Sequence, residues 1–241
     1  MKLVDTIMFA AQTPRSNAYA QAMAQKGINI KAAVVFGESS AAKPGQAKYV
    51  PDTNWPESPV FLPDLSISLD DALNRITNSV IHVDASHIND QVISDQLNDL
   101  SPNLVIYSGY GAQIVGSHLL DTEIPFLHLH AGWLPDFRGS TTTYFHLLDT
   151  GNCGVSAIRL EKEIDTGPIL SRKTFARPPS NVDIDYLYDS AIRADLLTDV
   201  LMYYANHNNL PVVTSQRPEE GDTYYVIHPV LKHISILSLS K

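Results

Sequence analysis

The sequence is poor in cysteine and has no long hydrophobic run. Its 241 residues include a single cysteine, Cys153. One cysteine excludes an internal disulfide framework and a zinc site built from several cysteines, and it suits a reducing compartment. No apolar stretch approaches the roughly 20 residues that a membrane-spanning helix needs, and the N-terminus does not have the pattern of a signal peptide. We therefore expect a cytoplasmic protein without a membrane partner.

Positive charge is also scarce. Lysine and arginine number 17 against 26 aspartates and glutamates, so the formal net charge is −9. Proteins that bind nucleic acids usually present a basic face to the phosphate backbone. The longest basic cluster here is the pair Arg172 and Lys173. The sequence therefore disfavours a nucleic-acid partner.

Apolar runs alternate with helical patterns along the first half of the chain. Strands are expected at residues 7–10, 28–36, 79–83, 104–107 and 126–130, with helices at 18–26, 88–100 and 112–120 between them. Strands separated by helices are typical of a parallel sheet. Residues 104–107 lack polar alternation, as expected for a central strand that is covered on both faces. The prediction is an α/β protein with an open, mainly parallel, Rossmann-like sheet.

The second half has a different order of elements. Residues 155–160 and 169–175 bracket a turn and predict a hairpin, and the longest helical pattern covers residues 182–204. We divide the chain into a catalytic domain at residues 1–205 and a small C-terminal extension at residues 206–241. Within this extension, residues 223–227 and 234–239 favour a short strand pair.

Two histidines lie where open α/β sheets bind ligands. His128 and His130 are two positions apart on a predicted strand, so their side chains project from the same face. They lie at the carboxyl end of that strand, which is the ligand-binding end of such sheets. A turn with an exposed-looking cation, Arg138, follows, and Asp165 comes in a tight Asp-Thr-Gly-Pro loop. These segments form one site if the hairpin folds back over the strand.

Each of these features also has a simpler interpretation. A histidine on an apolar strand is more often a hydrogen-bonded core residue, and Asp-Thr-Gly-Pro alone is a turn. His-x-His is also a metal-ligand spacing, and Asp165 could complete a site of two histidines and one carboxylate. A metal-dependent hydrolase that uses His128, His130 and Asp165 is therefore an alternative function.

The order and spacing of the motifs resemble those of the folate-dependent formyltransferase family. This family includes methionyl-tRNA formyltransferase, glycinamide ribonucleotide formyltransferase and the sugar N-formyltransferases. The resemblance extends over residues 104–170 and rests on His-Leu-His at 128–130, Leu-Pro-Asp-Phe-Arg-Gly at 134–139 and Asp-Thr-Gly-Pro-Ile at 165–169. It implies the formyltransferase fold, 10-formyltetrahydrofolate as the donor and an amine as the acceptor.

The resemblance also implies roles for individual residues. When the amine attacks the formyl carbon, the oxyanion that forms needs a preorganised hydrogen-bond donor, and the amine proton needs an acceptor. His130 would stabilise the oxyanion, and Asp165 would orient His130 and help to move protons. The pteridine would lie in a cleft lined by two stretches. These are Tyr110, Gly111, Ala112, Gln113 and Ile114, and Glu161, Lys162, Glu163 and Ile164.

One position departs from the family pattern, which is Asn-x-His. His128 stands in place of the asparagine, so an imidazole with one N–H replaces an amide with two. Since the ordinary histidine pKa is about 6.5, we expect the charge of His128 to change close to neutral pH. This residue would then make the protein a slow or unusual formyltransferase. A non-catalytic folate-binding protein is a further alternative.

Four residues are candidates for binding the acceptor. Ser16 and Asn17 begin the first predicted helix and resemble a phosphate-binding turn, and helix N-termini attract phosphate. Trp133 and Arg138 belong to the turn that follows the two histidines.

The remaining sequence bears on the identity of the acceptor. About seventy residues follow Ile169, so we expect no room for the tRNA-binding domain of the methionyl-tRNA enzymes. Residues 221–225 resemble a segment of the sugar formyltransferases. We therefore expect a small amine as the acceptor, with a nucleotide-linked amino sugar favoured, and the sequence is compatible with a homodimer.

Overall fold

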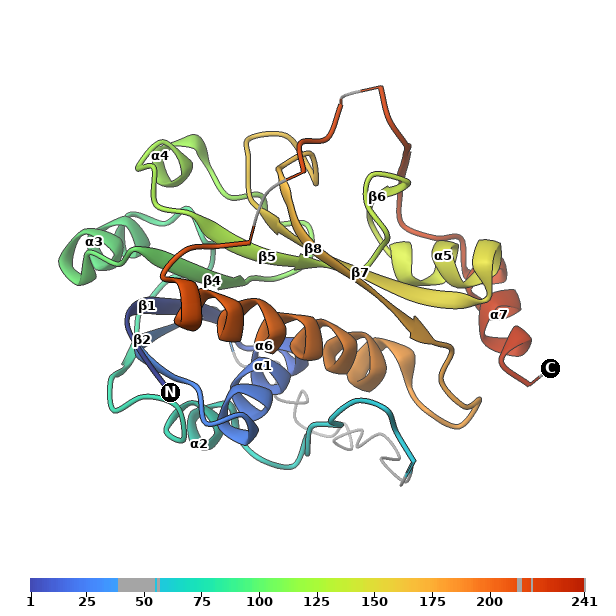
Figure 1. Cartoon of the computed structure of the whole chain (residues 1–241), viewed down its shortest axis with the longest axis horizontal. Helices are drawn as coiled ribbons and strands as arrows, with labels where there is room; N and C mark the ends of the chain where they lie inside the picture. Colours follow the sequence, from blue (N-terminus) through green and yellow to red (C-terminus); the bar gives the residue numbers. More distant parts are fainter. Residues whose placement is uncertain (39–54, 56, 212–213, 218, 241) are drawn as a thin grey trace.

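A seven-stranded sheet in the order β3-β2-β1-β4-β5-β7-β8 forms the centre of the structure (Figure 1). The computed structural model describes residues 1–38, 55, 57–211, 214–217 and 219–240. The strands are β1 (Lys2–Ala11), β2 (Asn29–Phe36), β3 (Val80–His82), β4 (Leu104–Ser108), β5 (Phe126–His130), β7 (Asn152–Arg159) and β8 (Ile169–Ala176). Pairing is parallel from β3 to β5 and antiparallel from β5 to β8. The predicted open, mainly parallel α/β sheet and its hairpin are confirmed.

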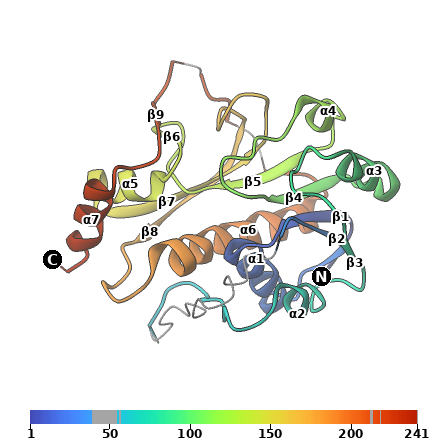
Figure 2. The same ribbon diagram turned by 180° about the vertical axis from the view of Figure 1, so that it is seen from behind.

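Helices cover both faces of the sheet (Figures 1 and 2). One face packs against α1 (Pro14–Gln25) and α6 (Asp189–His207). A π-helical turn (Ile184–Tyr188) precedes α6. The other face packs against α3 (Gln91–Leu100) and α4 (Ser117–Leu120). A short α2 (Leu69–Leu73) lies beside α1, and α5 (Thr142–Thr150) lies between β7 and α7 (Pro229–Ser238). None of the helices in the described part of the chain is long and apolar enough to cross a membrane.

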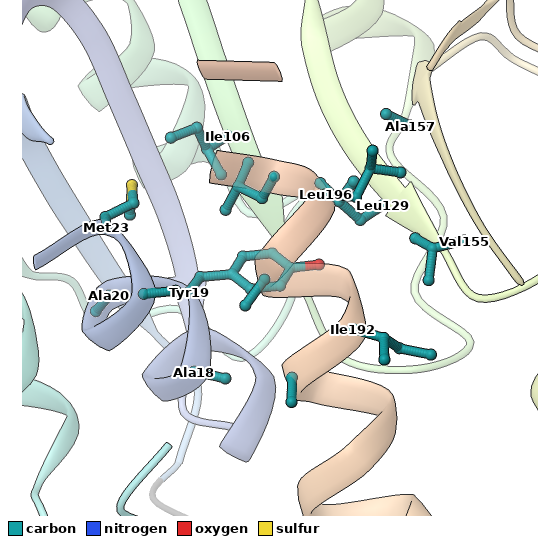
Figure 3. Close-up of a cluster of buried hydrophobic side chains, with 14 of the residues drawn as sticks. Ala18, Tyr19, Ala20, Met23, Ile106, Leu129, Val155, Ala157, Ile192 and Leu196 are labelled. Carbon is teal, nitrogen blue, oxygen red and sulfur yellow. The ribbon is translucent and has the colours of Figure 1, made fainter. Parts of the chain in front are cut away.

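Alternation along β1 divides the apolar core into two layers. Met8 and Ala10 belong to the layer beneath α1 and α6, whereas Ile7 and Phe9 belong to the layer beneath α3 and α4. Because successive side chains of a strand point to opposite faces, a central strand of this kind is buried on both sides. Figure 3 shows the first layer, in which Tyr19 of α1 lies among side chains of α6 and of the sheet strands.

The direction of strand order reverses between β1 and β4. From β1 the chain continues to β2 and β3 on one side, and from β4 it continues to β5 on the other. Ala10 pairs with Ser108, so the carboxyl ends of β1 and β4 lie side by side. Open α/β sheets bind ligands at such a switch point. The loops after β1, β4 and β5 therefore surround one potential site.

The C-terminal extension differs from its prediction. Residues 234–238 belong to helix α7, which Pro229 begins and which His228 caps by accepting a hydrogen bond from the Val230 N–H. Both features favour a helix start. The short strand β9 (Asp222–Tyr224) pairs in parallel with β6 (Phe137–Gly139), a strand that the sequence did not predict. The expected strand pair within the extension is therefore wrong, and the domain boundary at residue 205 stays a prediction.

Candidate active site

His130 is the last residue of β5, and only 4% of it is exposed. Its Nε2 lies 2.7 Å from the Phe137 carbonyl oxygen and 3.3 Å from Thr142 Oγ1. Its Nδ1 lies 3.3 Å from Asp165 Oδ2. A carbonyl and a carboxylate can only accept hydrogen bonds. Each ring nitrogen of His130 therefore faces an acceptor, Phe137 on one side and Asp165 on the other.

Asp165 is held by the loop that precedes β8. Its backbone is left-handed, with φ at +55°, and its Oδ2 accepts the Gly139 N–H at 2.9 Å. Burial raises the pKa of Asp165, but the contact with His130 and the Gly139 N–H outweigh burial. The pKa of Asp165 falls below its ordinary value. The carboxylate is therefore ionised at neutral pH.

His128 lies beneath this pair, with its ring centroid 5.9 Å from that of Tyr107 on β4. Its Nδ1 is buried and has no hydrogen-bond partner among the described residues. Burial lowers the pKa of His128 to about 3; Asp165 opposes this shift and Arg15 adds to it. The expectation that His128 changes charge close to neutral pH is therefore wrong. A neutral imidazole with an unpartnered nitrogen occupies the position of the family asparagine.

Arg15 is a further candidate at this switch point, although no pattern in the sequence singles it out. It follows Pro14 at the start of α1, and its Nη2 donates to the carbonyl oxygen of Gly109, in the loop after β4. Its Nε is buried without a partner among the described residues. Burial lowers the pKa of the Arg15 guanidinium, and the nearby Arg193 lowers it further. The available signal was a cation in the turn after the first strand, at the switch point.

Ser16 and Asn17 are buried next to Arg15, and their side chains bond to the protein itself. Ser16 Oγ lies 2.9 Å from Ser108 Oγ, and Asn17 Nδ2 donates to the Ile67 carbonyl oxygen at 2.6 Å. These bonds tie α1 to β4 and to the segment before α2. The role of Ser16 and Asn17 in binding the acceptor stays a prediction.

Arg138 is buried rather than exposed, with 4% of the residue accessible, so the expected exposed cation is wrong. Its Nη2 donates to Gln216 Oε1 at 3.1 Å and to the Arg217 carbonyl oxygen at 3.0 Å. Gln216 Nε2 in turn donates to the carbonyl oxygens of Asp165 at 2.9 Å and Gly167 at 2.6 Å. Arg138 therefore braces the Asp165 loop through Gln216. No pattern in the sequence singled out Gln216, because its role depends on a contact between distant segments.

Trp133, the fourth predicted acceptor residue, lines a cavity of 660 Å³. The Arg172 guanidinium lies 4.5 Å from the centroid of the Trp133 ring. The walls of this cavity include none of His128, His130 and Asp165. Trp133 therefore lines a cavity to which the two histidines and Asp165 do not contribute.

The two stretches expected to bind the pteridine have separate surroundings. Tyr110 donates its hydroxyl to the Glu38 carbonyl oxygen at 2.8 Å, and Gln113 Nε2 donates to the Ser86 carbonyl oxygen at 3.0 Å. Residues 161–163 line a second cavity, of 640 Å³, whose other walls come mainly from residues 120–125 and 159–160. Residues 110–114 do not line that cavity, so a single cleft formed by both stretches stays a prediction.

The two histidines and Asp165 do not form a metal-ligand set. Among the described residues, no group of three or more histidine, cysteine, aspartate or glutamate side chains could hold a metal ion. His130 uses Nδ1 for Asp165 and Nε2 for Phe137. The geometry therefore gives no support to the metal-dependent alternative.

Known proteins resemble this chain in sequence and in fold. A family model described as formyl transferase matches residues 5–190. Methionyl-tRNA formyltransferase of Finegoldia magna is 29% identical over 125 residues, which are 50% of this chain and 40% of that protein. The matched region thus spans less than half the length of this relative.

Two solved structures show the same fold. A sugar N-formyltransferase from a Shewanella species is 15% identical with a TM-score of 0.57, over 97% of this chain and 87% of that one. Phosphoribosylglycinamide formyltransferase from Anaplasma phagocytophilum is 14% identical with a TM-score of 0.58, over 91% of this chain and 96% of that one. At these identities the likeness concerns the fold alone.

Proposed function

The chain belongs to the formyl transferase family, and on that premise we propose that it transfers a formyl group from 10-formyltetrahydrofolate to a small amine. One observation supports this most directly. The buried pair of His130 and Asp165 lies at the carboxyl end of β5, beside the unpartnered Nδ1 of His128. Acyl transfer requires a preorganised hydrogen-bond donor and an acid–base group at one place, and these three residues offer both.

The residues present suit a reduced folate. His128 Nδ1 is a buried polar atom that lacks a partner among the described residues, and such an atom is costly unless a ligand satisfies it. Each of the two stretches assigned to the pteridine exposes an isoleucine, with Ile114 51% and Ile164 54% accessible. They offer apolar surface to a flat ring. When bound, 10-formyltetrahydrofolate supplies the formyl group.

The two histidines have different roles in this proposal. Both nitrogens of His130 face internal acceptors, so its ring is fixed in place before the reaction. In this proposal the fixed ring favours negative charge on the formyl oxygen. His128 remains neutral and supplies the directed hydrogen bond that an amide supplies in the family pattern. Asp165 orients His130 across their 3.3 Å contact. The amine gives up one proton as its bond to the formyl carbon forms, and the departing folate nitrogen takes up one proton, so the transfer balances.

For the acceptor we propose an amine that carries an anionic group, with a nucleotide-linked amino sugar favoured. Arg15 supports this choice, because its buried Nε lacks a partner among the described residues and a guanidinium recognises phosphate and carboxylate well. The net charge of −9 disfavours tRNA. Cys153 is a free, buried thiol, which suits the cytoplasm as the proposed location.

An acceptor screen tests the proposal. The protein is mixed with 10-formyltetrahydrofolate and a panel of amines with and without phosphate groups, and folate absorbance is followed. Mass spectrometry then identifies the formylated amine. We expect turnover with at least one anionic amine and none with the Asp165→Asn protein. Release of formate without any amine would instead indicate a hydrolase, and folate binding without turnover on any amine would indicate a binding protein.

A further inference from the structure

The cavity beside Trp133 has an unusual set of walls. It lies where β6 and β9 meet α5 and the start of β7, and it has a volume of 660 Å³. Its walls combine three aromatic and three acidic side chains, which are Trp133, Phe137, Tyr224, Asp136, Asp149 and Asp222.

The charge of this cavity is negative. Three carboxylates line it, and no lysine or arginine is among its lining residues. Burial raises the pKa of Tyr224, and Asp222, Asp149 and Asp136 all raise it further, so the three carboxylates act on one place. Carboxylates gathered in one cavity attract cations and repel anions. A nucleoside diphosphate is therefore a poor occupant.

His146 gives an independent indication of a ligand. The residue lines the cavity, is 5% exposed and makes no side-chain hydrogen bond within the described part of the chain. Its Nδ1 is a buried polar atom without a hydrogen-bond partner among the described residues. Burial lowers the pKa of His146, although Asp149 and Asp136 oppose this shift. A neutral imidazole can accept a hydrogen bond from an ammonium group.

The groups in the walls select the kind of cation. Within the described residues, no set of three carboxylate, histidine or cysteine side chains converges closely enough to hold a metal ion. An organic cation instead can contact carboxylates and aromatic rings together. The rings of Phe137 and Tyr224, stacked with centroids 5.5 Å apart, supply apolar wall for a hydrocarbon chain. We propose that this cavity is a second ligand site, which binds an organic cation of the diamine or polyamine class.

The second site is separate from the one proposed for formyl transfer. None of His128, His130 and Asp165 lines it. The nearest link is Phe137, whose ring forms part of the cavity wall while its carbonyl oxygen accepts the Nε2 hydrogen bond of His130. Binding of a polyamine can therefore be tested without any assay of formyl transfer.

Spermidine titration into the whole protein tests the site. Calorimetry reports the stoichiometry, and emission of Trp133 reports the cavity directly once Trp55→Phe has removed the other of the two tryptophans. We expect one saturable site at about 100 mM salt. Asp149→Asn and Asp222→Asn should each weaken binding by about 3- to 10-fold, the scale of one partly exposed ion pair.

Two further variants make the test specific. Asn152→Asp adds a fourth carboxylate to the same wall and should tighten spermidine binding, a gain that damage to the fold cannot imitate. Asp99→Asn removes the same charge from the exposed surface of α3 and should leave affinity unchanged. Absence of saturable binding would overturn the proposal. Equal weakening of spermidine binding by Asp99→Asn would overturn it as well. So would displacement of spermidine by Mg²⁺ at an equal concentration of positive charge. Either result would indicate that spermidine is attracted by the overall negative charge of the protein and not by this cavity.

Discussion

His130 Nδ1 and Asp165 Oδ2 lie 3.3 Å apart, although 35 positions separate the two residues in the chain. The contact forms because the loop between β7 and β8 folds back over the carboxyl end of β5. Asp165 is held there from two sides, by the Gly139 N–H on its carboxylate and by Gln216 on its carbonyl oxygen. The Gly139 N–H and the Gln216 side chain therefore position the loop that carries Asp165. We expect the sheet to remain folded when either member of the pair is replaced.

Replacing either member of the pair should abolish most of the activity. We expect His130→Ala and Asp165→Ala each to lower kcat/KM for formyl transfer by at least about 100-fold, the usual scale for an oxyanion-stabilising or acid–base group. Steady-state kinetics with the best acceptor measures this. His233→Ala, on the exposed side of α7, is the matched control and should leave kcat/KM unchanged. Near wild-type turnover in either variant would show that the role assignment is wrong.

His128→Asn should preserve or raise turnover, because it restores the amide donor of the family pattern. Burial holds the pKa of His128 at about 3, so this ring does not titrate between pH 5 and 8. The pH–rate profiles of the variant and the wild type should therefore have the same shape over that range. A variant that binds folate normally but loses all turnover would show that the imidazole has chemistry of its own.

The same substitution should make the fold more resistant to acid. Unfolded His128 takes up a proton below about pH 6.5, whereas the folded ring resists protonation until about pH 3. Wild-type stability is therefore lost as pH falls from about 6.5 towards 3, and asparagine removes this loss. We expect the variant to gain about 1–2 kcal/mol relative to the wild type between pH 7 and pH 5. Urea unfolding at both pH values measures the gain, and its absence would contradict the burial of His128.

Gln216→Glu tests the brace on the Asp165 loop. Glutamate keeps an acceptor for Arg138 but loses the N–H groups that hold the carbonyl oxygens of Asp165 and Gly167. Because the loop would then be misplaced, we expect kcat to fall about 10-fold with a smaller change in KM. Arg217→Ala is the control, since Arg217 offers Arg138 only its backbone carbonyl. Equal kcat and KM in the two variants would show that Gln216 does not position the Asp165 loop.

A reduced folate should bind between the two predicted stretches. We expect Ile114→Asp and Ile164→Asp each to weaken binding of 5-formyltetrahydrofolate by at least about 5-fold, because each places a charge on apolar contact surface. Calorimetric titration measures this affinity. Val226→Asp, at a side chain that is also exposed (75%) but lies just before α7, serves as the control. An effect confined to one isoleucine would show that the stretches do not share a cleft.

Local patterns are enough to predict the strands of the seven-stranded sheet, most helices and the order of motifs. Residues 126–130 were predicted as a strand and form β5, and the i, i+2 spacing of His128 and His130 placed both on one face. Such patterns depend only on neighbours along the chain. The helix α7 escaped prediction because its apolar residues suit either a strand or a helix, and the cap and proline that start it were overlooked.

Distant segments decided the rest. His128 is neutral because elements from α1, β4 and the Asp165 loop bury and surround it, and Arg138 is buried because residues 216–217 return to accept its hydrogen bonds. The acidic cavity exists because β9 pairs with β6, far away in the chain. The sequence by itself determined the fold class and the residues of the central pair, because periodicity and motif order are local. Only the tertiary structure decided burial, protonation and the second cavity, because these depend on which distant side chains displace water from one another.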